Sequence, residues 1–328
     1  MLSRGTLVRA IAGVAISVVT IVAIVRGIDL AKVAEILRTA SPAWVALTLG
    51  AVVVDLSIRS LRWKRLLAPI HPVPYVRTAG YLLIGYLANN VLPARLGELV
   101  RCHYLGDREG ISRTTTLGTV VVERVVDTAV VVGIASLSIV VLQVRGLVAN
   151  AVLFGLAVTS FGIVVLAILV VAHRLPGADR LARLAERWPR VADLGRKLHG
   201  GLAVAGRPRT LGEALLLSGL AWSATIVSFA AAGQSIGIEL STGQAALLVS
   251  GVALATAVPA GPGNLGTFDL AGVLIASSFG LEREHAVALV VLAHAAALTV
   301  TSIGGATALL RLGWARRPPV PVAESEPA

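Results

Sequence analysis

Long apolar runs follow one another along almost the whole chain, and they are the feature that most limits its fold. A helix needs about 20 mostly apolar residues to cross a bilayer, and most of these runs approach or exceed that length. The runs are Leu7–Val25, Ala43–Arg59, Thr78–Leu92, Thr115–Val144, Leu147–Ala172, Leu211–Gly233, Gln244–Pro259, Thr267–Phe279 and Ala286–Leu310. This pattern predicts an all-α protein that crosses a membrane several times.

The composition excludes an ordinary soluble enzyme. Of the 328 residues, 56% are hydrophobic and only 14% are charged, whereas soluble domains carry about 25% charged residues. The net charge is +11, but the basic residues lie between apolar runs, an arrangement typical of membrane proteins that face anionic lipid. We therefore expect no nucleic-acid partner. Cys102 is the only cysteine, which excludes an intramolecular disulfide and a thiolate zinc site.

Two segments are too short or too broken to cross the membrane simply. The run Thr78–Leu92 ends in a polar Asn-Asn-Val-Leu-Pro sequence, and a Pro- and Gly-rich turn at 259–266 interrupts Gln244–Phe279. Broken helices at membrane depth are tolerated only where protein or a polar cavity surrounds them. If the two segments enter and return from opposite sides, 23 Lys and Arg lie inside and 5 outside, as the positive-inside rule requires. We predict six full spans, two opposed re-entrant helical hairpins, and both termini in the cytoplasm.

The chain is predicted to form one transmembrane domain over residues 1–315, followed by a disordered tail, rich in Pro and Glu, at 316–328. Within the domain, residues 174–209 place Leu and Trp at three- and four-residue spacing with Arg between them. That pattern predicts a basic amphipathic helix on the inner leaflet, with anionic lipid as its partner. The segments Pro93–Gly97 and Pro262–Gly266 share a P-x-x-L-G spacing, which favours an inverted repeat of the two hairpins.

Charged residues inside apolar sequence are the strongest candidates for function. A charge at the centre of a membrane helix costs about 2.5–3.5 kcal/mol on insertion scales, so each must be paired or face a wet cavity. The candidate headgroup-binding residues are Asn89, Asn90, Arg95, Glu98, Arg101, Glu123, Arg124 and Asp127. One interpretation is a polar chamber, and the other is a structural knot of ion pairs that locks helices together.

In the chamber interpretation, Arg95 and Arg101 would hold a phosphate, because a planar guanidinium matches two phosphate oxygens. Glu98, Glu123 and Asp127 would orient these arginines or meet a cationic headgroup. The turn that contains Gly263, Asn264 and Gly266 opens a helix whose N-terminal N–H groups attract anions, although it could equally be a plain interhelix turn. Residues expected to support the site are Asp55, Arg59, Pro93, Gly97, Pro262 and Asp269.

Other polar residues receive structural interpretations. The basic cluster 62–65 favours an anchor at the cytoplasmic interface, above all for Trp63 and the two residues after it. His294 is alone in the last apolar run and favours packing or an interhelical hydrogen bond. We predict no catalytic residue, no metal site and no cofactor.

The charged motifs resemble a known family. The pattern N-x-x-P-x-R-x-G-E-x-x-R, then E-R-x-x-D in the next helix and a late Gly-rich turn, is similar to the flippase-like family named for the transmembrane region of lysylphosphatidylglycerol synthase. The resemblance covers roughly Val45–Leu310. The matching residues are Asn90, Pro93, Arg95, Gly97, Glu98, Arg101, Glu123, Arg124, Asp127, Gly263 and Gly266.

The resemblance implies lipid translocation. Members with a cytosolic aminoacyltransferase domain make and export lysylated phosphatidylglycerol, and related proteins are associated with polyprenyl-phosphate, glycolipid or hopanoid pathways. We expect this chain to lack that domain and any lysyltransferase activity. It would flip or scramble a phosphate-bearing lipid, such as an aminoacylated phospholipid or a polyprenyl-phosphate-linked lipid, across the cytoplasmic membrane. The alternatives are a membrane subunit that supports a separate synthase or glycosyltransferase, and an intramembrane enzyme that acts on a lipid-phosphate carrier.

Overall fold

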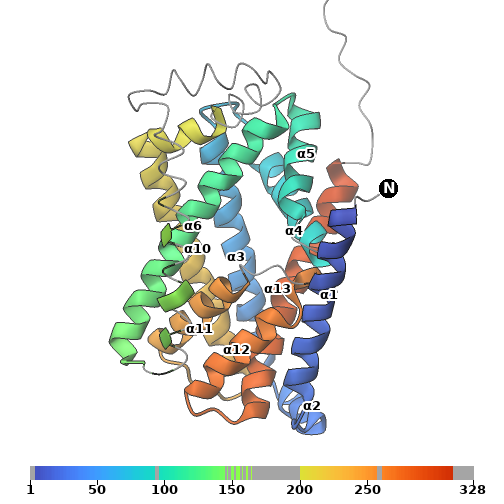
Figure 1. Cartoon of the computed structure of the whole chain (residues 1–328), viewed down its shortest axis with the longest axis vertical. Helices are drawn as coiled ribbons and strands as arrows, with labels where there is room; N and C mark the ends of the chain where they lie inside the picture. The colour runs from blue at the N-terminus through green and yellow to red at the C-terminus, as the bar shows by residue number, and fades with distance from the viewer. Residues whose placement is uncertain are drawn as a thin grey trace, which may run out of the picture.

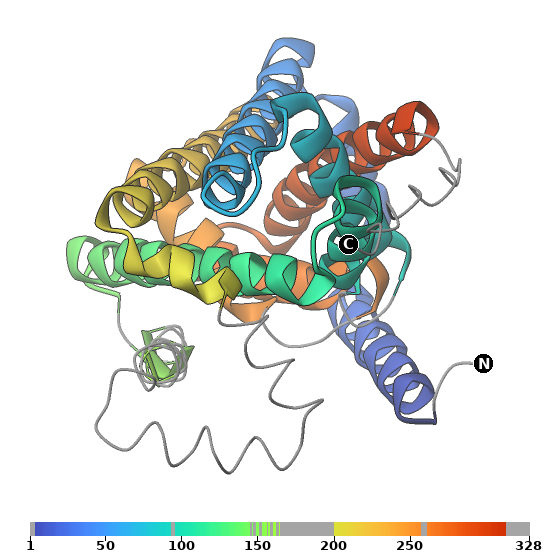
Figure 2. The same cartoon turned by 90° about the horizontal axis from the view of Figure 1, so that it is seen from above.

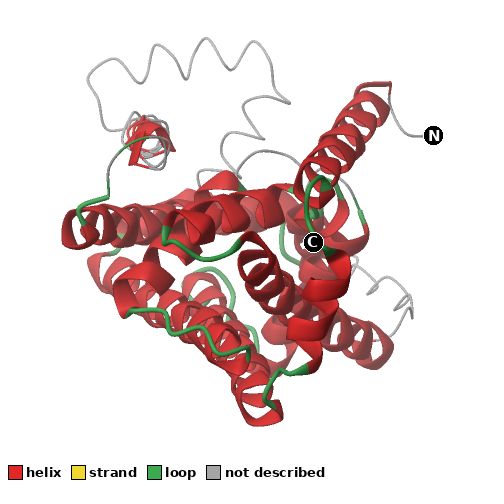
Figure 3. Ribbon diagram, turned by 90° about the horizontal axis from the view of Figure 1, so that it is seen from below, coloured by secondary structure: helices red, strands yellow, loops and turns green. Residues whose placement is uncertain are grey.

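The computed structural model describes residues 4–92, 96–144, 200–256 and 261–312, with a few further residues between 146 and 164. Every regular element in these residues is a helix (Figures 1 and 3), so the all-α polytopic membrane fold is confirmed. The elements are α1 (Arg4–Val25), α2 (Leu30–Arg38), α3 (Pro42–Leu67), α4 (Tyr75–Val91), α5 (Gly97–Glu109), α6 (Arg113–Leu142), η3 (Ala203–Gly206), α10 (Pro208–Ser235), α11 (Thr242–Ala255), η4 (Pro262–Asn264), α12 (Thr267–Ser278) and α13 (Arg283–Leu312).

Four helices, α3, α6, α10 and α13, are long and apolar enough to cross a membrane, with 26 to 30 residues each. At 1.5 Å per residue they reach about 39 Å or more, which exceeds the hydrocarbon thickness of about 30 Å. They match four of the six predicted spans. The predicted span Leu7–Val25 corresponds to α1, whereas Leu147–Ala172 lies mostly outside the described residues. The count of six spans therefore stays a prediction.

The two interrupted segments form two helical pairs. Helix α4 packs against α5, and α11 packs against α12. In Figure 1 the first pair lies in the upper half of the molecule and the second pair in the lower half. The helices of both pairs have only 12 to 17 residues, too few to cross a bilayer. This arrangement agrees with the predicted pair of opposed hairpins, although the return arm α5 was expected only as a connection.

The contact between α4 and α5 is unusually close. A Cβ atom on Gly97 would overlap the backbone carbonyl of Gly85 and the side chain of Asn89, so only glycine fits at the start of α5. Asn89 Oδ1 accepts a hydrogen bond from the Gly97 N–H at 2.7 Å. Asn89 therefore holds the two arms of the hairpin together.

Of the four long helices, α3 and α10 each contact the other three, and Figure 2 shows the four helices from above. Helix α3 packs along α10, and α13 packs along α4. Large apolar side chains such as Leu137, Leu216 and Leu310 point away from the protein, with 65–82% of their surface exposed, as expected for side chains that face lipid. Most of the predicted helix 174–209 and the whole tail 316–328 lie outside the described residues.

Candidate functional site

The charged side chains of α3 and α6 converge because of helical spacing. Asp55, Arg59 and Arg62 follow one another at intervals of four and three residues, and Glu123 and Asp127 are four residues apart. Residues three or four apart share one face of a helix. Helix α3 packs against α6, so the two charged faces meet inside the protein.

Asp127 is the point where three helices meet. Its carboxylate is 5% exposed and accepts hydrogen bonds from both terminal nitrogens of Arg62, one of them at 3.0 Å, and from Arg59 at 3.4 Å. Ser218 Oγ and Trp222 Nε1 of α10 also donate to it, at 3.1 and 3.2 Å. A buried carboxylate is tolerated when charged and neutral donors satisfy it in this way.

Glu123 forms a second centre that joins α3, α5 and α6. It is 1% exposed, and Arg101 reaches its two oxygens at 3.0 and 3.3 Å. Arg62 lies 3.4 Å from it, and Arg124 lies 2.5 Å from it. The Arg101 guanidinium also lies over the Trp63 ring, 4.7 Å from the ring centroid. This deeper part of the network therefore resembles the second interpretation, a structural knot of ion pairs that locks helices together.

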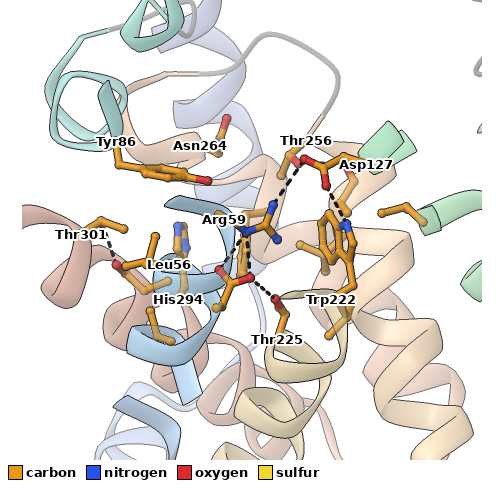
Figure 4. Close-up of a pocket in the computed structure, with 18 of the residues that line it drawn as sticks. Leu56, Arg59, Tyr86, Asp127, Trp222, Thr225, Thr256, Asn264, His294 and Thr301 are labelled. Carbon is orange, nitrogen blue, oxygen red and sulfur yellow. Dashed lines mark hydrogen bonds and ion pairs between the residues drawn. The ribbon is translucent and has the colours of Figure 1, made fainter. Parts of the chain in front are cut away.

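A cavity of about 470 Å³ opens beside these ion pairs. Figure 4 shows Asp127 and Trp222 on one side of it and His294 and Thr301 on the other. Apolar residues of α11 and α13, including Val252, Leu254 and Leu298, form much of the remaining wall. The polar and charged residues that line it are Asp55, Arg59, Tyr86, Asn90, Arg124, Asp127, Thr128, Trp222, Thr225, Thr256, Asn264, His294 and Thr301.

A smaller cavity of about 110 Å³ lies at the α4–α5 pair. Asn89, Gly97, Glu98 and Arg101 line only this smaller cavity. The residues that line both cavities are Tyr86, Asn90, Arg124 and Asn264. The two cavities therefore meet at a set of polar residues that includes Arg124.

Arg124 differs from the other arginines of the network in its exposure. Its side chain is 43% exposed, against 0% for Arg62, 5% for Arg101 and 7% for Arg59. Because it lines both cavities, the exposed part of Arg124 faces their interior. Arg124 also pairs with Glu123 and lies 3.6 Å from Asp127, but among the four arginines of the described network it has by far the most exposed side chain and is therefore the most accessible to a ligand.

In the glycine-rich turn, Gly263 and Gly266 were both expected at the headgroup site, but they lie in different surroundings. Gly263 and Gly266 both have left-handed backbone angles, with φ of 64° and 90°, which glycine adopts without strain. Gly263 lines the larger cavity. Gly266 instead lies against Ser17 and Thr20 of α1, and its N–H donates to Asp269 at 2.9 Å. The Gly266 N–H is therefore occupied within the protein, and anion binding by the other N–H groups at the start of α12 stays a prediction.

His294 lies opposite the ion pairs and is hydrogen-bonded through both ring nitrogens. Nδ1 is 2.8 Å from Asp269 Oδ1, and Nε2 is 2.9 Å from the carbonyl oxygen of Gly263. The ring stacks on Phe268 with centroids 3.9 Å apart. These contacts agree with the hydrogen-bonding interpretation of His294, and they bring Asp269 to the edge of the site.

The structure brings most of the predicted site residues together. Asn90 lines both cavities and donates to Thr301 and Ser302 at 2.8 and 3.0 Å.

Pro93 and Arg95 lie outside the described residues, so the predicted phosphate contact of Arg95 stays a prediction. Pro262 begins η4 and shapes the turn without lining either cavity. The predicted phosphate role of Arg101 is limited by its burial against Glu123.

The interface-anchor interpretation of the cluster 62–65 is wrong for its first two residues. Arg62 and Trp63 are both 0% exposed, and Trp63 Nε1 donates to Thr119 at 3.2 Å. The spacing of Arg62 from Asp55 and Arg59 was the signal that could have revealed its role.

Other members of the site that the sequence did not single out are Tyr86, Ser218, Trp222 and Thr225. In the described residues, no group of three or more His, Cys, Asp or Glu is placed to hold a metal ion.

The fold and the chamber define the class of protein: a polytopic α-helical membrane protein with two short helical pairs and a charged internal cavity. The chain belongs to the family described as the lysylphosphatidylglycerol synthase TM region, which matches residues 10–305. The resemblance seen in the motifs is thereby confirmed.

Two curated relatives extend the comparison. The chain is 27% identical to glycosyltransferase AglD of Haloferax volcanii over 340 residues, which cover 92% of this chain and 54% of AglD. It is 33% identical to the UPF0104 membrane protein MJ1595 of Methanocaldococcus jannaschii over 118 residues, 35% of each protein. The chain thus spans about half the length of AglD.

Proposed function

We propose that the chain binds the headgroup of a phosphate-bearing lipid in the chamber and carries it across the cytoplasmic membrane. The observation that carries this proposal is Arg124, a guanidinium that pairs with Glu123 yet lines both cavities and stays 43% exposed, whereas the deeper arginines are buried. A guanidinium binds phosphate oxygens through paired, charge-assisted hydrogen bonds. Asn90 and Asn264 border the same space and supply further polar groups.

The shape of the larger cavity supports a ligand with two chemical halves. Its volume of about 470 Å³ falls in the range of small-molecule sites, about 300–1,000 Å³. One side carries charged and amide groups, whereas α11 and α13 contribute apolar walls. A lipid headgroup could occupy the polar side while its acyl chains remain in the bilayer.

The two helical pairs support movement across the membrane. In transporters, binding sites near the midplane are commonly formed by broken helices from two opposed repeats. Here the cavities are lined by α4 of the first pair and by η4, at the tip of the second.

The ion pairs argue for transport rather than catalysis. A general base needs a carboxylate that can accept a proton from the substrate. Asp55, Glu123 and Asp127 instead each accept hydrogen bonds from at least one arginine. We therefore propose a protein that binds and moves its lipid without changing it covalently.

The comparison with AglD favours a second candidate. AglD is named a glycosyltransferase, and this chain matches about half of its length. The chain could therefore serve as a membrane subunit for a separate enzyme that works on a lipid-linked glycan. In that case the purified chain would move no lipid by itself, and a glycosyltransferase would co-purify with it.

Lipid movement in proteoliposomes tests the first proposal. The purified chain is reconstituted with fluorescent phosphatidylglycerol, or with a fluorescent diacylglycerol as uncharged control, and an impermeant reductant quenches the outer leaflet. We expect quenching of phosphatidylglycerol to continue beyond the outer half, and Arg124→Gln to slow it at least about tenfold. Arg65→Gln is the matched control, because Arg65 is 56% exposed and pairs with Glu213 away from both cavities. Equal rates for Arg124→Gln and wild type would contradict the site assignment.

A further inference from the structure

The lipid-binding proposal gives no role to the Asp269–His294 pair. His294 is 5% exposed and lines the larger cavity. Both of its ring nitrogens face oxygen atoms: the Asp269 carboxylate at 2.8 Å and the Gly263 carbonyl at 2.9 Å. A carbonyl oxygen can only accept a hydrogen bond, and an ionised carboxylate can only accept as well.

This geometry requires one proton more than a neutral histidine carries. Neutral imidazole has a single N–H, so either tautomer would place a bare nitrogen lone pair against an oxygen less than 3 Å away. The extra proton therefore belongs to the Asp269–His294 pair. The second oxygen of Asp269 accepts the Gly266 N–H in the first turn of α12, where a carboxylate is favoured, and this favours the proton on His294.

We propose that Asp269 and His294 form a proton-binding site, and that its occupancy is coupled to anion binding in the chamber. Only the coupling to anion binding rests on the proposed function; the proton-binding site does not. The protonated pair, imidazolium beside carboxylate, is neutral overall, whereas loss of the proton leaves one negative charge on Asp269, directly behind the cavity-lining His294. An anionic headgroup in the same cavity would then bind less tightly, and by linkage the bound anion would hold the proton.

The charges around the cavity are arranged to transmit this effect. The titratable and charged groups that face His294 across it are Asp55 and Arg59 on α3, Tyr86 on α4, and Arg124 and Asp127 on α6. The two arginines and two aspartates carry equal and opposite charge, within a larger network that also includes Arg62, Arg101 and Glu123. The proton on His294 therefore changes the net charge around the cavity by one unit. Lys32 of α2 pairs with Glu282 beside the first turn of α13 and takes no part in the cavity.

The proton also connects the chamber to the second helical pair. The acceptor of the Nε2 hydrogen bond is the carbonyl of Gly263, inside η4 at the tip of that pair. Loss of either ring proton removes a hydrogen bond between α13 and α12 or between α13 and the tip. A change of protonation is thus also a change in how firmly the tip is held.

Nitrogen-15 NMR of the histidine rings tests the proton site without any lipid ligand. The chain, with all six histidines labelled, is placed in phosphatidylcholine nanodiscs, and His294→Gln identifies the His294 signals. We expect both ring nitrogens of His294 to carry protons at pH 7. A single ring N–H throughout pH 5–8 would overturn the proton site. If His294→Gln does not fold, Asp269→Asn supplies the assignment, because it should shift only the signals of its partner.

Phosphatidylglycerol affinity at two pH values tests the coupling. Short-chain phosphatidylglycerol is titrated into the nanodiscs at pH 6 and at a pH above the deprotonation seen by NMR. We expect wild-type affinity to fall at least about fivefold and His294→Gln to show no such fall. His103→Gln is the control, because His103 is 53% exposed and pairs with Asp107 outside both cavities.

The outcomes separate the two proposals. Equal pH dependence in wild type and His294→Gln would overturn the coupling while leaving lipid binding established. A folded chain that binds no phosphatidylglycerol at either pH would contradict the proposed function and the coupling together, and the NMR result would then decide the proton site alone.

Discussion

Arg101 on α5 and Glu123 on α6 form a two-point ion pair, with N–O distances of 3.0 and 3.3 Å, in which both side chains are almost completely buried. The pair attaches the first short helical pair to a long membrane helix. Arg62 and Arg124 converge on the same carboxylate, so three arginines share Glu123.

Removal of that carboxylate should be severely destabilising. Glu123→Gln leaves Arg101 buried without the carboxylate that it pairs with, whereas Arg62 keeps Asp127, and breaking a buried ion pair in this way costs about 3–5 kcal/mol. We expect a large drop in the midpoint of thermal unfolding, measured on the purified protein in detergent. Glu239→Gln is the control, since Glu239 is exposed between α10 and α11. An unchanged midpoint for Glu123→Gln would show that the network contributes little to stability.

Arg124→Lys separates charge from geometry in the proposed lipid site. Lysine keeps the positive charge but loses the planar fork that binds two phosphate oxygens at once. We expect Arg124→Lys to move phosphatidylglycerol at a rate between those of wild type and Arg124→Gln in the proteoliposome assay. A lysine variant as slow as the glutamine variant would mean that bidentate binding, and not charge alone, is required.

Gly97→Ala should disrupt the α4–α5 pair. The added methyl group would overlap the Gly85 carbonyl and the Asn89 side chain, and overpacking of this kind costs about 1–3 kcal/mol. Gly133→Ala is the matched control, because nothing lies within 4 Å of a Cβ at that position of α6 and alanine favours helix. Thermal unfolding should therefore show a loss for the first variant and no loss for the second.

Cys102 should react slowly with maleimides in the folded protein. It lies on α5 and is 3% exposed, and burial raises the pKa of its thiol to about 11. The reactive thiolate is therefore scarce at pH 7, and labelling should become fast only after denaturation. Rapid labelling of the native protein would mean that α5 opens readily.

The same chemistry tests the predicted orientation. In a Cys102→Ala background, Glu239→Cys should react with an impermeant maleimide added to intact cells, because the α10–α11 connection is predicted to lie outside. Arg77→Cys, on the predicted cytoplasmic side and 47% exposed in its native side chain, should react only after permeabilisation. The reverse pattern would invert the topology.

The long helices and the short helical pairs could be predicted because their signals are local. Apolar length alone marks α3, α6, α10 and α13, and a polar interruption marks each short pair. The charged residues of α6 could also be found, because Glu123, Arg124 and Asp127 stand out within an apolar run. Such signals need only a window of about 20 residues.

The partners in the site could not be predicted because they are distant in sequence. In the sequence Arg62 resembles an interface anchor, because its partner Asp127 lies 65 residues further along the chain. His294 is alone in its run, and both Asp269 and Gly263 come from other elements. Tyr86 and Trp222 carry no local mark of function, since aromatic residues near membrane interfaces are common.

The position of Asp127 has a consequence for how the protein is made. Helix α3 is synthesised before α6, so Arg59 and Arg62 must enter the membrane well before their shared carboxylate exists. Asp55 can neutralise Arg59 from within α3, but Arg62 must await α6, and Ser218 and Trp222 arrive only with α10. The partners of this one carboxylate are therefore spread over more than 150 residues of chain, and the order in which they are synthesised leaves Arg62 unpaired until α6 follows.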